Sequence, residues 1–218
     1  MPPSRILFAV TLLVLLPAVA AAGSVEGRLY WSRQAAAADS AHQRDAFSQL
    51  QTGIDDAVIS LEPSPAKLER RLSKAAKHAR TAPGIDQRSM QFVPRVMVLA
   101  TGDSVLFTNS DSLYHNVFSV STACHFDLGR MRPGRVEVVH FDHPGVINLH
   151  CELHPDMIGY VVVLPQRLYT RPDATGSFEL PNLPKGHYVL RVWHPRRGEL
   201  ARAFDVPRRG SANLALVF

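Results

Sequence analysis

The sequence predicts an all-β protein built from two β-sandwiches with short helices. Of its 218 residues, 16 are proline and 13 are glycine, which disfavours long uninterrupted helices over most of the chain. From residue 92 onward, short runs rich in Val, Phe and Ile are separated by Gly, Asp, Asn and Pro at intervals typical of a β-sandwich. With 46% hydrophobic and 20% charged residues, the chain can form packed cores, which excludes a disordered protein.

Residues 1–22 predict a secretory signal peptide. Arg5 precedes an apolar run over residues 6–16, Pro17 ends it, and small residues follow. The run is too short to span a bilayer, and no later run approaches the required length. The first cysteine is Cys124, so a lipid anchor at the cleavage site is excluded. We therefore expect an exported, periplasmic protein with no integral membrane segment in the mature chain.

Two strands are expected near the start of the mature chain, VEGRLYW over residues 25–31 and AVISL over residues 57–61. The alanine-rich stretch 35–50 between them predicts a helix. An amphipathic helix and a linker follow over residues 64–84, because apolar side chains recur there at helical spacing.

This second helix carries much of the formal net charge of +5. Only Glu69 is acidic between residues 67 and 80. Two interpretations stay open: a solvated helix face, or a docking surface for an acidic partner. Nucleic acid is excluded as a partner, since no aromatic side chains alternate with the cations in an exported chain. The cations are Lys67, Arg70, Arg71, Lys74, Lys77 and Arg80.

Residues 85–165 predict a Greek-key β-sandwich. Its expected strands are the runs FVPRVMVLA, DSVLFTN, HNVFSVS, RVEVVHF, GVINLHC and IGYVVVL.

The run HCELHPDM places Cys151, His154 and Met157 directly after one of these strands and before the next. A short loop would turn the three side chains toward one point. His115 starts another strand after the polar turn 110–112 and supplies a fourth ligand. One thiolate, two imidazoles and a weak thioether favour copper in both oxidation states, whereas zinc has little use for a thioether.

Neighbouring residues suggest two alternatives to this site. A disulfide between Cys124 and Cys151 would remove the thiolate and leave the other ligands unexplained. His150 next to Cys151 would serve a second copper only with histidines from another domain or subunit. Since a site with four protein ligands has no open position and no catalytic motif stands out, we expect no enzyme activity.

The remaining histidines have no ligand-like spacing, and they are expected at the surface or in turns: His140, His143, His187 and His194. Met90 and Met97 lie on apolar stretches and are expected in the core.

The motif HNVFSV, with HCELHPDM followed by IGYVVVL, resembles type I copper proteins of the cupredoxin superfamily, in particular amicyanin and the plastocyanin-like methylamine utilization proteins. The short spacing between cysteine, histidine and methionine is the amicyanin-like feature. The resemblance covers residues 85–165. It implies one copper ion bound by His115, Cys151, His154 and Met157, and a hydrogen bond from Asn116 to the cysteine-bearing loop.

The C-terminal run DATGSFEL, with the later LP, Gly and alternating Tyr, Leu and Val, resembles the transthyretin-like (carboxypeptidase-regulatory-like) module. Such modules begin with strands like those near residues 25–31 and 57–61. We therefore expect residues 25–63 and 166–218 to form one split sandwich, with the cupredoxin domain inserted in it.

Together these features predict a monomeric periplasmic copper protein that carries single electrons between redox partners. An acidic partner is expected if the basic helix is a docking surface. The electron is expected to pass through the exposed edge of His154. One alternative is a copper carrier or storage protein without redox cycling. Another is a binding module in which the metal site is vestigial.

Overall fold

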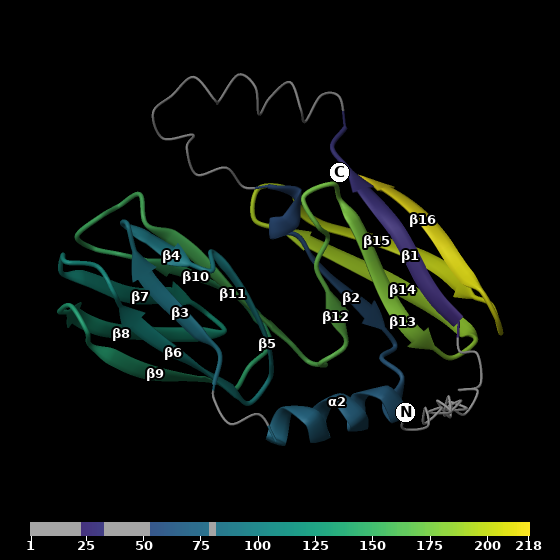
Figure 1. Ribbon diagram of the computed structural model, residues 1–218, viewed down its shortest axis with the longest axis horizontal. Coiled ribbons are helices and arrows are strands. Elements are labelled where there is room, and N and C mark those ends of the chain that lie inside the picture. Colours follow the sequence, from purple (N-terminus) through teal and green to yellow (C-terminus); the bar gives the residue numbers. More distant parts are fainter. Residues whose placement is uncertain (1–22, 33–52, 79–81) are drawn as a thin grey trace, which may run out of the picture.

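The computed structural model describes residues 23–32, 53–78 and 82–218. This part of the chain is mostly β, with one α-helix and four sheets that pack as two β-sandwiches (Figure 1). The predicted signal peptide, the predicted helix over residues 35–50 and residues 79–81 of the basic stretch lie outside the described residues. No α-helix in the described part is both long and apolar enough to cross a membrane.

Sandwich A is formed by two sheets with the strand orders β5-β11-β10-β7-β8 and β4-β3-β6-β9. A core of large buried side chains such as Phe107, Phe141 and Leu149 fills the space between these sheets. The strands are β3 (Gly84–Arg88), β4 (Gln91–Val93), β5 (Val96–Ala100), β6 (Asp103–Asn109), β7 (His115–Ser121), β8 (Cys124–Met131), β9 (Val136–Phe141), β10 (Gly145–His150) and β11 (Ile158–Leu164).

Two details of sandwich A differ from the sequence prediction. The run 92–100 forms two strands in different sheets, because Pro94 has no N–H to continue a ladder. Strand β8 was not predicted, because its sequence is polar. In the structure every second side chain over most of this strand is partly shielded from solvent. As the edge strand next to β7, it can expose the other side chains without cost.

Sandwich B combines segments from both sides of sandwich A in the sequence. Strand β1 (Gly23–Tyr30) pairs antiparallel with β13 (Ser177–Leu183) and parallel with β16 (Ser211–Val217). The facing sheet has the order β12-β2-β14-β15, formed by β12 (Tyr169–Thr170), β2 (Val58–Glu62), β14 (Gly186–His194) and β15 (Gly198–Val206). A 3-10 turn (Ile54–Asp56) precedes β2. The type of this additional β domain stays a prediction.

Helix α2 (Ala66–His78) packs on sandwich B through Leu68 and Leu72, which contact the core of that sandwich. Its single acid, Glu69, accepts hydrogen bonds from the backbone amides of Arg167 and Leu168, each at 2.9 Å. The helix is therefore tied to the segment that connects the two sandwiches.

The two sandwiches meet at a small apolar cluster of Val58, Val96, Val98 and Val162. Beside it, Arg167 donates two hydrogen bonds to the carboxylate of Asp103, at 2.6 and 2.7 Å. Such paired, charge-assisted bonds fix orientation as well as position. Because Asp103 is the first residue of β6, sandwich B and α2 are attached to the end of sandwich A where β6 begins (Figure 1).

Two expectations about single residues are wrong. His194 is buried, because its ring packs edge-on against Trp31 and shares a hydrogen bond with the carbonyl of Gly53 at 3.1 Å. Burial lowers the pKa of His194 to about 4, so this ring is neutral at pH 7. Met90 is exposed, because it lies in the turn between β3 and β4 with a positive φ of 55°.

Candidate metal centre

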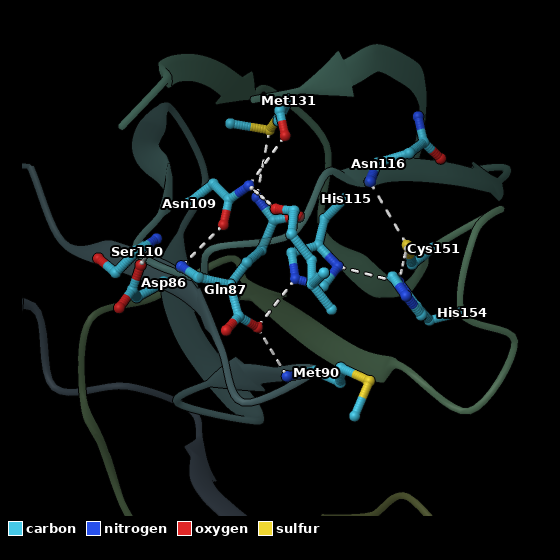
Figure 2. A network of polar contacts seen from close by, with 12 residues as sticks. Asp86, Gln87, Met90, Asn109, Ser110, His115, Asn116, Met131, Cys151 and His154 are labelled. Carbon is cyan, nitrogen blue, oxygen red and sulfur yellow. Dashed lines mark hydrogen bonds and ion pairs between the residues drawn. The ribbon is translucent and has the colours of Figure 1, made fainter. Parts of the chain in front are cut away.

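Three potential ligands meet at the end of sandwich A where β7 begins and β10 ends. His115 is the first residue of β7, Cys151 follows β10, and His154 lies on the loop toward β11. The Nδ1 atoms of the two histidines are 3.0 Å apart, and Sγ of Cys151 is 3.7 Å from Nδ1 of His154. All three donor atoms lie within 4.8 Å of one another (Figure 2).

The orientation of His115 is set by Asp111. The Nε2 atom of this fully buried ring lies 2.9 Å from Oδ2 of Asp111. The backbone amide of Met90 donates to the same oxygen, and these two contacts hold the pKa of Asp111 below its usual value. An ionised carboxylate can accept hydrogen bonds but cannot donate them, so Asp111 keeps the proton of the His115 ring on Nε2. The Nδ1 lone pair of His115 then faces His154 and Cys151.

The turn that carries Asp111 is itself braced by buried polar side chains. Asn109, with 1% of its surface exposed, donates to the carbonyls of Leu113 and Met131 and accepts the amide of Asp111. Gln87 lies beside it, fully buried, and donates to Sδ of Met131. Figure 2 shows this network beside His115. The turn is thus held from within the sandwich, which fixes the position of the carboxylate.

Cys151 is 3% exposed, and its Sγ atom is 3.4 Å from the backbone amide of Asn116. The Asn116 side chain donates to Asp127 and to the carbonyl of Gly129 on β8. Its Oδ1 atom accepts the amide of Glu152, on the loop that follows Cys151, at 3.3 Å. Asn116 therefore links the edge strand, β7 and the cysteine-bearing loop.

Met157 is 1% exposed and belongs to the same core cluster as Cys151. Its backbone amide donates to the carbonyl of His154 at 2.9 Å, which closes the loop between the two residues. Its role as a weak axial ligand stays a prediction.

The donor set fits a copper ion. Metal bonds of about 2.0–2.3 Å to nitrogen and sulfur require donors that lie within roughly 4 Å of each other. The Nδ1 atom of His154 is this close to both other donors, at 3.0 and 3.7 Å, and all three donors lie within 4.8 Å. One buried thiol, two histidines and a buried methionine in the adjacent turn are consistent with a type I copper site.

The second cysteine lies elsewhere. Both cysteines are free, and Cys124 pairs with Ser121 at the opposite end of β7 from His115. Burial raises the pKa of the Cys124 thiol, and Asp142 adds to the shift. This residue is therefore a thiol in the structure and is remote from the ligands.

The ring of His150 packs against Phe118, with 5.6 Å between ring centroids.

Exposed apolar side chains stand next to both predicted histidine ligands in sequence. His154 is half-buried, whereas His115, Cys151 and Met157 are buried. Leu113, Tyr114 and Leu153, which directly precede the two histidine ligands in sequence, are 47%, 56% and 36% exposed. We refer to Leu113, Tyr114 and Leu153 as the apolar rim.

Sequence reasoning missed Asp111, Asn109 and Gln87. Asp111 stands in the polar turn before His115, directly after Asn109 and Ser110, and a carboxylate four residues before a predicted histidine ligand was a usable signal. Gln87 lies on β3, which is parallel to β6, and its proximity to the site follows from that pairing alone.

Residues 79–164 match the family of copper binding proteins described as the plastocyanin/azurin family. Similar solved structures include a reduced Cu(I) variant of amicyanin, 28% identical, with 41% of this chain and 89% of that chain covered and a TM-score of 0.37. An oxidised amicyanin variant gives the same four values. A Cu-containing nitrite reductase from Thermus scotoductus SA-01 is 22% identical, with 38% and 22% covered and a TM-score of 0.37. No curated protein matches the chain.

Proposed function

We propose that this chain, whose residues 79–164 carry the copper-binding domain of the plastocyanin/azurin family, is an exported electron carrier that has no enzyme activity of its own. Its partner would be a redox protein in the periplasm, and the carrier would act as a monomer. The observation that carries the proposal is the buried thiol of Cys151 facing the Nδ1 atoms of two histidines.

Copper would supply a one-electron couple at this site. His115, Cys151, His154 and Met157 would hold it. The chain's contribution is rigidity, because Asp111 fixes one ring and the Asn116 amide fixes the thiol before any metal binds. Ligands that keep their positions in both oxidation states leave little reorganisation to oppose electron transfer.

The apolar rim provides the docking surface in this proposal. His154 alone among the predicted ligands reaches the surface, and the exposed rim residues directly precede His154 and its neighbour His115 in the chain. Redox proteins form small, short-lived interfaces, for which a modest apolar patch without charged anchors is sufficient.

The test of the function is Cu(II) loading of the purified protein. An electron carrier is expected to become intensely blue or green through sulfur-to-copper charge transfer, and to bleach reversibly with one electron per copper. A copper carrier or storage protein would bind Cu(I) tightly and give no stable coloured Cu(II) form. That outcome, or a colour lost irreversibly on the first reduction, would contradict the proposal.

The docking surface is tested by Leu153→Asp. Electron self-exchange requires two copies to meet through their rims, so like charges at the contact are expected to slow it at least about tenfold. Self-exchange has no driving force, and a change of reduction potential therefore does not confound the rate. Val120→Asp is the matched control, because Val120 is 68% exposed near the other end of β7. Equal rates for both variants would show that the rim is not the docking surface.

A further inference from the structure

The cations of helix α2 form a continuous stripe on its exposed side. At 3.6 residues per turn, Lys67, Arg70, Arg71, Lys74 and Lys77 fall within an arc of about 120°. All five side chains are exposed. The salt bridges found among the described residues involve none of them.

The rest of the helix is turned away from this stripe. Leu68 and Leu72 lie on the roughly opposite side and contact the core of sandwich B. Glu69 also points away from the stripe, since its carboxylate accepts the amides of Arg167 and Leu168. The one acid of the helix therefore does not neutralise the cations, and no apolar side chain interrupts them.

The stripe lies far from the predicted copper ligands. Through Glu69 and Arg167, α2 is connected to Asp103 at the start of β6. Asn109 at the other end of β6 braces the turn of Asp111 beside His115. Seven residues of strand span about 23 Å, so α2 and the metal centre are at opposite ends of sandwich A (Figure 1). A redox partner bound to α2 would be too remote to receive an electron from His154.

We infer that the α2 stripe docks the protein onto an anionic phospholipid surface and leaves the apolar rim facing away from the bilayer. Specific protein interfaces are organised around aromatic or apolar anchors, and the stripe has none. Lipid headgroups require only positive charge, and each Lys or Arg near an anionic surface strengthens binding by about fivefold. Since both leucines of α2 are engaged in the fold, binding is expected to be peripheral, reversible and sensitive to salt.

The experiment is co-sedimentation of the chain beginning at Gly23 with vesicles of phosphatidylcholine, with and without phosphatidylglycerol. Starting at Gly23 removes the apolar run of residues 6–16, which would bind lipid by itself. The wild-type protein is expected to sediment only with vesicles that contain phosphatidylglycerol. It should dissociate at about 1 M ionic strength, where the Debye length is about 3 Å.

The decisive variant replaces Lys67, Arg71 and Lys74 with glutamine, which preserves helix propensity. Its affinity for the anionic vesicles is expected to fall about a hundredfold, while its circular dichroism and copper absorption stay unchanged. The matched control replaces three exposed cations of sandwich B with glutamine and so removes the same charge: Lys185, Arg202 and Arg208.

Three results would overturn the inference: no binding of the wild type to anionic vesicles, an equal loss in both variants, or α2-dependent binding to an acidic polypeptide without binding to the vesicles. The last would assign the stripe to an acidic protein. Because the assay measures lipid binding, its result is separate from the colour test of the proposed function.

Discussion

Replacement of Cys151 by serine is expected to abolish the charge-transfer colour of the Cu(II) protein and its reversible redox cycle. The colour arises from sulfur bound to copper, and no other described thiol lies near the two histidines. Serine is close in volume, and its hydroxyl can accept the amide of Asn116, so the buried position tolerates it. The measurement is the visible spectrum after Cu(II) loading, with a thermal melt to show that the fold persists.

Cys124→Ser is the matched control for this experiment. Cys124 is the other free cysteine, it is half-buried, and it lies at the opposite end of β7. Its replacement should leave the spectrum and the redox cycle as in the wild type. A coloured Cys151→Ser protein, or equal bleaching in the two variants, would remove Cys151 from the site and with it the proposed function.

Replacement of Asp111 by alanine is expected to reduce copper affinity by about 10–100-fold, as loss of a partner that orients a metal-bound histidine does. The Nε2 atom of His115 is buried, and without the carboxylate it has no acceptor at 2.9 Å. The ring is then free to change its tautomer and orientation. Asp111→Asn retains an oxygen that can accept from both His115 and Met90, so its affinity should stay near that of the wild type.

The same pair of variants separates orientation from charge. A carboxylate beside His115 stabilises the higher positive charge of Cu(II), so Asp111→Asn should raise the reduction potential even where the affinity for Cu(I) is retained. Voltammetry of the coloured protein measures this shift. An unchanged potential in Asp111→Asn, together with equal copper affinity for the alanine and asparagine variants, would contradict both roles. Asp111 would then only stabilise the turn.

Much of the architecture could be predicted from local patterns. Residues such as Tyr188, Leu190 and Val192 alternate with less buried neighbours on β14, and that alternation identifies a strand without knowledge of its partners. Strand β8 shows the limit of such reasoning. Its polar sequence becomes a strand because β7 offers it a ladder, and Asn116 secures it with hydrogen bonds to Asp127 and Gly129.

The metal centre also has parts that the sequence predicts and parts that it does not. Cys151, His154 and Met157 occupy one short loop, so their common position could be inferred from spacing alone. The bond between Asp111 and His115 depends on a turn held by Gln87 and Asn109, residues of two parallel strands. The same dependence made the prediction for Met90 wrong, because the pairing of β3 with β4 places this residue in an exposed turn.

The donor set and the alternating strands could be inferred from the amino-acid sequence, because ligand chemistry and side-chain periodicity depend on residues that are close together in the chain. The three-dimensional arrangement was needed to show which carboxylate orients His115, that Cys124 lies at the other end of β7, and that the basic side of α2 is remote from the metal centre. These features arise from strand pairing and from contacts between distant segments such as Glu69 and Arg167, and no local pattern encodes them.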